Sequence, residues 1–101
     1  MAMFGLIGRA RALPGRRDDL VSVLADGAEP MPGCLSYVVA EDPSDPDGVW
    51  VTEVWEDQAA HRASLQLPSV QERIQRGRPL IVDFDQFHET RPVAGVPGAA
   101  R

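Results

Sequence analysis

The residues best suited to chemistry in this sequence are Glu53, Trp55 and His61, which lie close together in the chain. Histidine can take up a proton near neutral pH because its ordinary pKa is about 6.5. A tryptophan ring offers a flat apolar wall for an aromatic molecule, and a carboxylate can hold an imidazole in one orientation. These residue types predict a site in which His61 is a general base, Glu53 orients it and Trp55 packs against an aromatic ring.

Each of these residues also has a purely structural explanation. His61 is expected on a helix, where a half-exposed histidine can form only local hydrogen bonds, and Trp55 could simply fill the core. Glu53 could form an ion pair with Arg62 or Arg73, since burying a lone carboxylate costs on the order of several kcal/mol. Both explanations stay open on the sequence alone.

Two further side chains are candidates for substrate binding. Tyr37 is the only tyrosine, and its hydroxyl could donate a hydrogen bond to a substrate oxygen or merely reach the rim of the site. Arg73 could stabilise an anionic substrate, or it could lie on the solvated face of a helix. No metal site is expected, because Cys34, His61 and His88 have unrelated spacings and a structural zinc site needs about four such ligands.

Composition restricts the class of protein. The 101 residues form one domain, expected over residues 1–91, and a Pro-, Gly- and Ala-rich tail is expected over residues 92–101. The net charge is −5 and the chain has no lysine, which argues against nucleic-acid binding. We find neither a membrane-spanning stretch nor a secretory signal at the N-terminus, so we expect a cytoplasmic protein without membrane association.

The pattern of apolar residues, prolines and glycines predicts the order β-α-β-β-α-β. Strands are expected over residues 3–13, 34–40, 49–55 and 80–89, a helix over 16–28, and helical pieces over 58–65 and 69–77. Asp57 is expected to cap the second helical region, which continues after Pro68. This order is the α+β, ferredoxin-like arrangement, a four-stranded antiparallel sheet with its helices on one face.

The expected strands carry apolar residues on both faces. In the third strand these divide into Val49, Val51 and Trp55 on one face, and Trp50 and Val54 on the other. In the last strand they divide into Leu80, Val82 and Phe84 on one face, and Ile81 and Phe87 on the other. An antiparallel sheet with one face in water should instead alternate between apolar and polar residues. A second copy of the chain is the simplest cover for the other face, which predicts a homodimer.

One stretch of the chain is similar to a known signature. Residues 50–65, WVTEVWEDQAAHRASL, hold a strand that ends in Glu-x-Trp, an acidic turn, and a helix with a histidine about six residues after the tryptophan. This arrangement resembles the signature of the antibiotic biosynthesis monooxygenase superfamily. The opening strand, the turn at Pro14 and Gly15 and the segment MPGCL at 31–35 also fit. The resemblance implies a dimeric αβ-barrel.

The resemblance also discriminates between branches of the superfamily. Polyketide-oxidising members carry an asparagine four residues before the tryptophan and a tyrosine six residues after it, where this chain has Val51 and His61. Haem-degrading members use an asparagine and a later histidine, but this chain has no asparagine and has Leu65 at the second position. The quinol-oxidising branch is therefore the best fit, with Thr52, next to Val51, as a remaining polar group near the substrate.

This resemblance implies a cofactor-independent monooxygenase that oxidises a quinol or an aromatic polyketide-like substrate with dioxygen, with no metal, haem or flavin. Two other functions remain open. The hydrogen bond lost at Val51 is compatible with a non-catalytic module that binds a small aromatic ligand. A non-redox isomerase or cyclase could use His61 for proton transfer.

Overall fold

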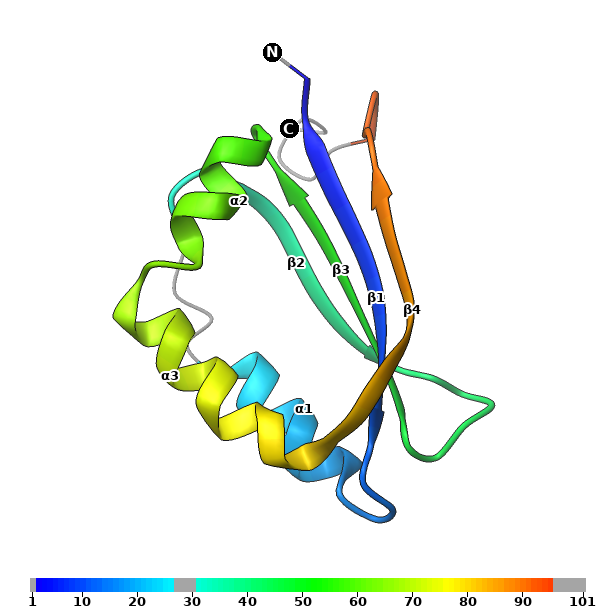
Figure 1. Cartoon of the computed structure of the whole chain (residues 1–101). Coiled ribbons are helices and arrows are strands. Elements are labelled where there is room, and N and C mark those ends of the chain that lie inside the picture. Colours follow the sequence, from blue (N-terminus) through cyan, green and yellow to red (C-terminus); the bar gives the residue numbers. More distant parts are fainter. Residues whose placement is uncertain (1, 27–30, 96–101) are drawn as a thin grey trace.

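The computed structural model describes residues 2–26 and 31–95. Figure 1 shows a four-stranded sheet with all of its helices on one face. The strands are β1 (Phe4–Ala12), β2 (Cys34–Glu41), β3 (Gly48–Trp55) and β4 (Ile81–Thr90). The helices are α1 (Arg17–Ala25), α2 (Gln58–Ser64) and α3 (Pro68–Gly77), and a short 3₁₀ turn (Arg78–Leu80) leads into β4. The strand order is β2-β3-β1-β4 and every pairing is antiparallel, which confirms the α+β, ferredoxin-like fold.

Local sequence signals account for most helix boundaries. Asp57 caps α2, because its Oδ1 accepts a hydrogen bond from the backbone N–H of Ala60 at 2.8 Å. Pro68 occupies the first turn of α3, where its missing N–H costs nothing. The first helix is shorter than predicted, since α1 ends at Ala25 and Asp26 is already extended. The rest of the predicted helix, residues 27–28, lies outside the described residues.

The core lies between the helices and the face of the sheet that they cover, called here the inner face. One cluster contains Ala10, Ala12, Leu20 and Val49, and all four are almost completely buried. A second cluster, at the other end of the sheet, joins Phe4, Leu6 and Trp55. The small side chains of β1 let α1 approach the sheet closely at the first cluster, whereas α2 covers the second.

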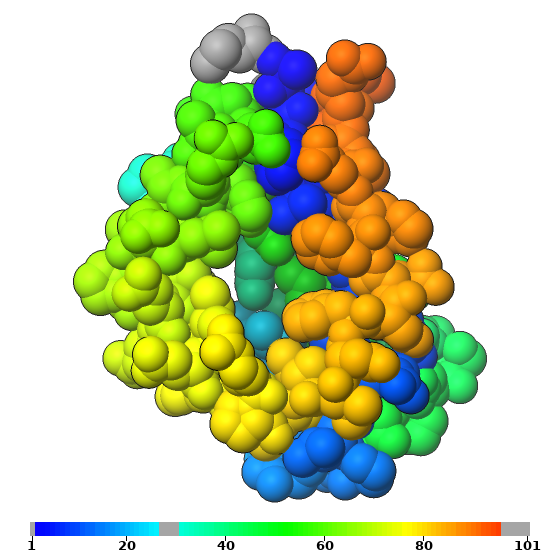
Figure 2. Space-filling model, in the orientation of Figure 1, coloured from blue at the N-terminus to red at the C-terminus, as the bar shows by residue number. Residues whose placement is uncertain are grey.

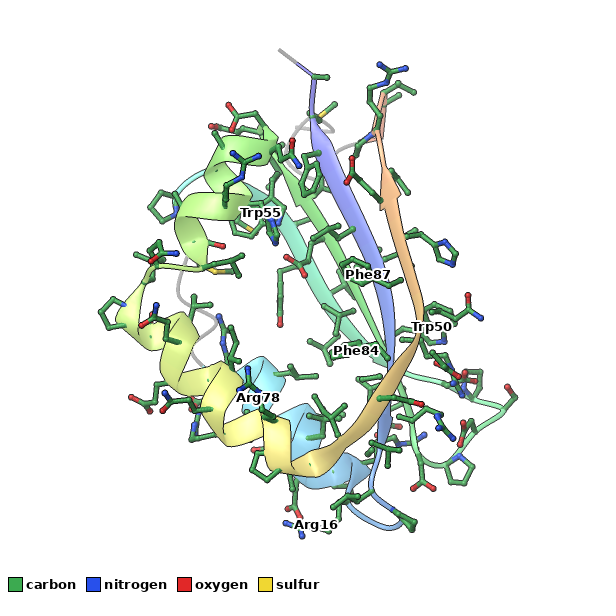
Figure 3. All side chains as sticks on the ribbon, viewed as in Figure 1. Arg16, Trp50, Trp55, Arg78, Phe84 and Phe87 are labelled. Carbon is green, nitrogen blue, oxygen red and sulfur yellow. The ribbon has the colours of Figure 1, made fainter. Side chains whose placement is uncertain are left out.

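The predicted faces of the last strand are wrong, because β4 has two irregularities, one between its pairs with Arg9 and Ala10 and one between its pairs with Arg11 and Ala12. Phe84 pairs with Ala10, but the next pair along β1 is Arg9 with Gln86, so Asp85 is an extra residue in β4. This shift brings Phe84 and Phe87 to the same face, the inner one. The ring of Phe87 lies over Gly8, which has no side chain in the way (Figure 3).

The opposite, outer face of the sheet is apolar only in part. The outward residues of β4 are polar; they are Asp83, Asp85, Gln86, His88 and Thr90. The other three strands contribute apolar residues, namely Ile7, Val38, Trp50 and Val54. Val38 is 50% exposed. The outer apolar patch therefore covers β1, β2 and β3 and excludes β4, contrary to the sequence pattern.

An ion-pair network lies at one end of this outer face. The guanidinium of Arg9 contacts three carboxylates, those of Asp42, Asp45 and Asp85. The indole N–H of Trp50 donates to Asp42 as well, at 3.2 Å. Because Asp42 and Asp45 belong to the loop between β2 and β3, the network ties that loop to β1 and β4.

None of the helices in the described part of the chain is long and apolar enough to span a membrane.

The Asp42 network predicts sensitivity to acid. Hydrogen bonds from the backbone and hydroxyl of Ser44, and then from Arg9, hold the pKa of the Asp42 carboxyl well below its usual range. The unfolded chain therefore binds the proton first as the pH falls below about 4, and this contribution to folding is lost on further acidification. We expect Asp42→Asn to lower the melting temperature at neutral pH and to reduce its fall between neutral pH and pH 3.

Thermal unfolding followed by circular dichroism at both pH values measures this effect. Glu89→Gln is the matched control, because Glu89 is exposed and has no hydrogen bond or ion pair in the described part of the chain. An acid response of Asp42→Asn equal to that of the wild type would contradict the assignment.

Candidate functional site

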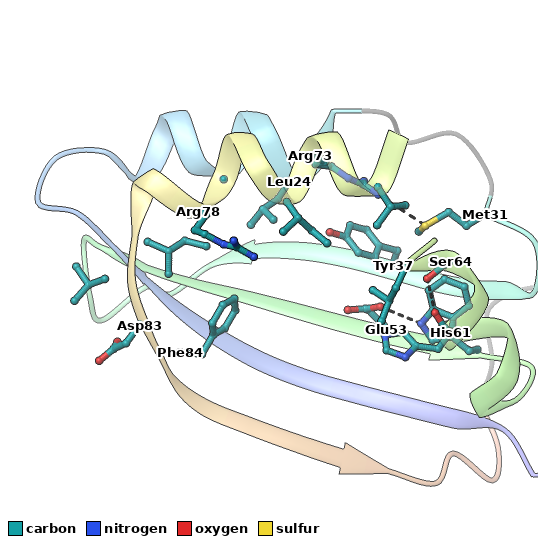
Figure 4. Close-up of a pocket in the computed structure, with 17 residues that line it drawn as sticks. Leu24, Met31, Tyr37, Glu53, His61, Ser64, Arg73, Arg78, Asp83 and Phe84 are labelled. Atoms are coloured by element: carbon teal, nitrogen blue, oxygen red, sulfur yellow. Dashed lines mark hydrogen bonds between the residues drawn. The ribbon is translucent and has the colours of Figure 1, made fainter. Parts of the chain in front are cut away.

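A cavity of about 520 Å³ lies between the inner face of the sheet and the helices. Figure 2 shows the hollow between α2 and α3 on one side and β4 on the other. Apolar side chains form most of its wall. The polar or charged residues that line it are Tyr37, Glu53, His61, Ser64, Arg73 and Arg78, with Asp83 at the rim. The structure thus brings together four of the predicted site residues with chemically active groups, and Trp55 lines the same cavity (Figure 4).

His61 is held in the cavity wall by aromatic contacts. Its ring centroid lies 5.3 Å from that of Phe4, and 5.4 Å from that of Trp55 in an edge-to-face arrangement. The Asp57 cap fixes the start of α2 and so places His61 in the first turn, facing the sheet. Its side chain forms no hydrogen bond within the described residues, which leaves the imidazole available to a ligand.

Glu53 and Trp55 form a pair on one strand face. The indole N–H of Trp55 donates to Oε1 of Glu53 at 3.0 Å, and Trp55 is only 1% exposed. This bond replaces two sequence-based expectations, since Glu53 neither holds His61 nor forms an ion pair with Arg62 or Arg73 in the described chain. Trp55 thus fills the core and lines the cavity at once, and Glu53 keeps a second oxygen for a ligand.

Tyr37 and Arg73 are neighbours in the cavity wall. The guanidinium of Arg73 lies 5.7 Å from the centre of the Tyr37 ring. It also donates to the carbonyl oxygen of Asp26 at 3.2 Å and contacts the sulfur of Met31. Burial raises the pKa of the Tyr37 hydroxyl, and the positive charge of Arg73 partly opposes this rise. Tyr37 therefore remains a hydrogen-bond donor at neutral pH.

Two predicted substrate-binding residues do not line the cavity. Thr52 pairs with Ile7 and Val38 in the sheet and points to the outer face. Val51 shares the inner face with Glu53 but is not part of the cavity wall. The alternation of a strand puts neighbours on opposite faces, so Thr52 and Glu53 could not both have faced the same ligand.

Sequence reasoning missed Arg78 and Phe84 as cavity residues. Arg78 was expected in a connecting segment, but α3 ends at Gly77 and the following 3₁₀ turn directs the arginine toward the cavity. A glycine and a proline on either side of Arg78 were the available signal for a turn there. The sequence pattern put Phe84 on the face opposite to that of Phe87. Only the irregularity in β4 shows that both rings lie on the inner face, which the helices cover.

The described residues contain no group of three or more His, Cys, Asp or Glu side chains arranged to hold a metal ion. What the cavity offers is a proton acceptor in His61, a donor in Tyr37, a carboxylate in Glu53 and two arginines, set in apolar walls. The arrangement suits a planar, mainly apolar ligand with ionisable hydroxyl groups.

The fold and this cavity define a small α+β domain of ferredoxin-like topology with a largely apolar cavity under its helices. The family model for antibiotic biosynthesis monooxygenase matches residues 3–76. The crystal structure described as "putative Antibiotic biosynthesis monooxygenase from Chloroflexus aurantiacus J-10-fl" is 61% identical, with a TM-score of 0.89 over 92% of this chain and 95% of that one. The chain therefore belongs to the antibiotic biosynthesis monooxygenase family.

More distant structures share the architecture. A protein of the same designation from Deinococcus radiodurans is 25% identical, with a TM-score of 0.74 over 91% of this chain and 94% of that one. Another from Caulobacter crescentus CB15 is 14% identical, with a TM-score of 0.79 over 92% of each chain, and it supports the fold alone. None of the curated proteins matches this chain.

The environment of Tyr37 predicts its titration. Because Tyr37 is the only tyrosine, the ultraviolet absorbance of its phenolate reports this one hydroxyl. We expect a midpoint above the ordinary value of about 10 in the folded protein and a return to that value in denaturant. Arg73→Gln should raise the midpoint further, since it removes the opposing positive charge.

Circular dichroism at each pH ensures that the folded protein is being titrated. Equal midpoints in the folded and denatured chains would show that the Tyr37 hydroxyl is not buried in the cavity. Arg62→Gln is the control, since Arg62 is exposed on α2 and does not line the cavity.

Proposed function

We propose that this protein is a cofactor-independent monooxygenase that oxidises a quinol or a polyketide-like phenol with dioxygen. The observation that carries the proposal is the convergence of His61, Tyr37 and Glu53 on one largely apolar cavity. Membership of the monooxygenase family supports the reaction class. This chemistry requires a base, a donor to an oxyanion and a water-poor pocket, which His61, Tyr37 and the apolar walls of the cavity would supply.

In the proposed mechanism, His61 accepts the proton of a phenolic hydroxyl. The phenolate that forms is electron-rich enough to pass an electron to dioxygen, and recombination forms a carbon–oxygen bond. One oxygen atom stays on the ring as a carbonyl, the other leaves as water, and the phenol is oxidised to a quinone. Tyr37 donates a hydrogen bond to the developing oxyanion.

The walls of the cavity would position the substrate ring and exclude water from it. Trp55 provides a flat surface at the His61 end and keeps water away from the reacting ring, as the apolar lining does elsewhere. Glu53, held by the indole of Trp55, accepts a hydrogen bond from a second substrate hydroxyl. A quinol, which has two hydroxyl groups, satisfies both His61 and Glu53.

The role of His61 is tested with His61→Phe. This change keeps an aromatic ring against Phe4 and Trp55 but removes the base. Losing a general base typically lowers the rate by about 10²- to 10⁴-fold, so we expect hydroquinone turnover to fall at least tenfold with little change in melting temperature. Oxygen consumption measured with an electrode reports the rate.

Arg62→Gln is again the matched control, one residue along the same helix and outside the cavity. Wild-type turnover in His61→Phe would show that His61 only packs against its aromatic neighbours. Product formed from the substrate under anaerobic conditions would instead support a non-redox isomerase or cyclase.

We also propose that the protein is a homodimer in which the outer apolar patch of β1, β2 and β3 faces its counterpart in a second copy. The supporting observation is a sheet face that no helix covers, on which Val38 is exposed beside the half-buried Ile7, Trp50 and Val54. The polar outward residues of β4 border this patch and suit the rim of an interface.

The dimer is tested with Val38→Asp, which puts a charge into the proposed interface. Sedimentation should show a dimer for the wild type at micromolar concentration and a shift toward monomer for the variant. Val93→Asp is the control, because Val93 is 84% exposed and lies beyond the sheet. A wild-type monomer, or a dimer unaffected by Val38→Asp, would contradict the proposed interface.

A further inference from the structure

Arg78 places a positive charge at one end of the cavity. It follows α3 directly, and in Figure 4 its side chain points from the 3₁₀ turn into the cavity, near Phe84. Within the described residues its side chain forms no ion pair and no hydrogen bond. An arginine can satisfy a carboxylate with two parallel hydrogen bonds, so this guanidinium is free to bind an acidic ligand.

Most other arginines of the described chain differ from Arg78 in this respect. Carboxylate partners are found for Arg9, Arg11, Arg16, Arg17 and Arg76. Arg62 and Arg91 have no such partner but lie outside the cavity wall. Arg73 lines the cavity, but it is engaged with the ring of Tyr37 and the carbonyl of Asp26.

Asp83, although close in sequence to Phe84 and part of the cavity rim, does not neutralise Arg78. Both of its carboxylate oxygens accept hydrogen bonds from Arg11, each at 2.7 Å. Figure 4 shows its side chain turned away from the cavity. Arg11 also holds the pKa of Asp83 below its usual range. No described residue therefore compensates the charge of Arg78 at its end of the cavity.

The other polar groups of the cavity lie at a distance from Arg78. His61 and Glu53 occupy the end near α2, whereas Arg78 and Phe84 occupy the end where α3 leads into β4. Apolar side chains, among them Leu24, line the space between. A ligand that fills the cavity would thus have one end beside a base and a carboxylate, and the other end beside a guanidinium.

We propose that the cavity is built for a hydroxylated aromatic acid, with its hydroxyl end toward His61 and its carboxylate toward Arg78. Such a ligand matches the charges, since a carboxylate at the other end would meet Glu53. Phe84, which is 55% exposed, supplies a flat face beside the acid-bearing ring. This inference deepens the proposed monooxygenase function, but the binding of the acid does not require turnover.

The test uses two probes of the same shape, 6-hydroxynaphthalene-2-carboxylate and 6-hydroxynaphthalene-2-carboxamide, with binding measured by calorimetry. Only the first carries a charge. Because Arg78 is solvent-exposed, we expect the wild type to bind the acid roughly three- to fivefold more tightly than the amide. Arg78→Gln should abolish that preference, Arg78→Lys should keep part of it, and high salt should weaken it.

Arg62→Gln is the matched control, since it removes an equally unpaired charge outside the cavity wall and should leave the preference intact. Equal affinity for the two probes, or a preference that survives Arg78→Gln, would overturn the inference. Failure of both probes to bind would overturn it too. Oxygen consumption with hydroquinone is measured separately, so a failure of the acid preference is distinguishable from a failure of the monooxygenase function.

Discussion

The burial of Trp55 governs the arrangement of the whole site. A tryptophan that is removed from water must find an acceptor for its indole N–H, and Glu53, two residues away on the same strand face, provides it. This bond holds a carboxylate in a cavity with mainly apolar walls, and it does so without an arginine partner in the described chain. The rings of Trp55 and His61 pack edge to face, so that the imidazole and the carboxylate share one support.

The charged side chains on the two sides of the sheet differ in whether they have ion-pair partners. On the outer face the charges are paired: Arg9 is surrounded by three aspartates, and Arg11 holds Asp83. These pairs fasten the loop between β2 and β3 and the irregular part of β4 to β1. On the inner face, Glu53 and Arg78 have no ion-pair partner in the described chain. Charges that are paired serve the fold, whereas charges left unpaired around a cavity are available to a ligand.

The cavity exists because the helices cover the inner face unevenly. Small residues of β1 bring α1 close to the sheet at one cluster, and α2 closes the other end over Phe4 and Trp55. Between these contacts, α3 and β4 remain apart, and Phe84 and Phe87 stay exposed. The irregularity in β4 matters here, since a regular strand would have turned one of these two rings to the outer face.

The sequence alone determined the order of elements, the Asp57 cap, the shared face of Glu53 and Trp55 and the family, because these depend on local pattern and spacing. It also selected Tyr37, His61 and Arg73 from a region that the fold brings together. The tertiary structure decided the partner of Glu53, the outward orientation of Thr52, the common face of Phe84 and Phe87 and the position of Arg78 at the cavity. Each of these depends on register, on one extra residue in β4 or on which side chain arrives within hydrogen-bond distance. A linear pattern carries no such information, since contacts between distant segments are selected only when the chain packs.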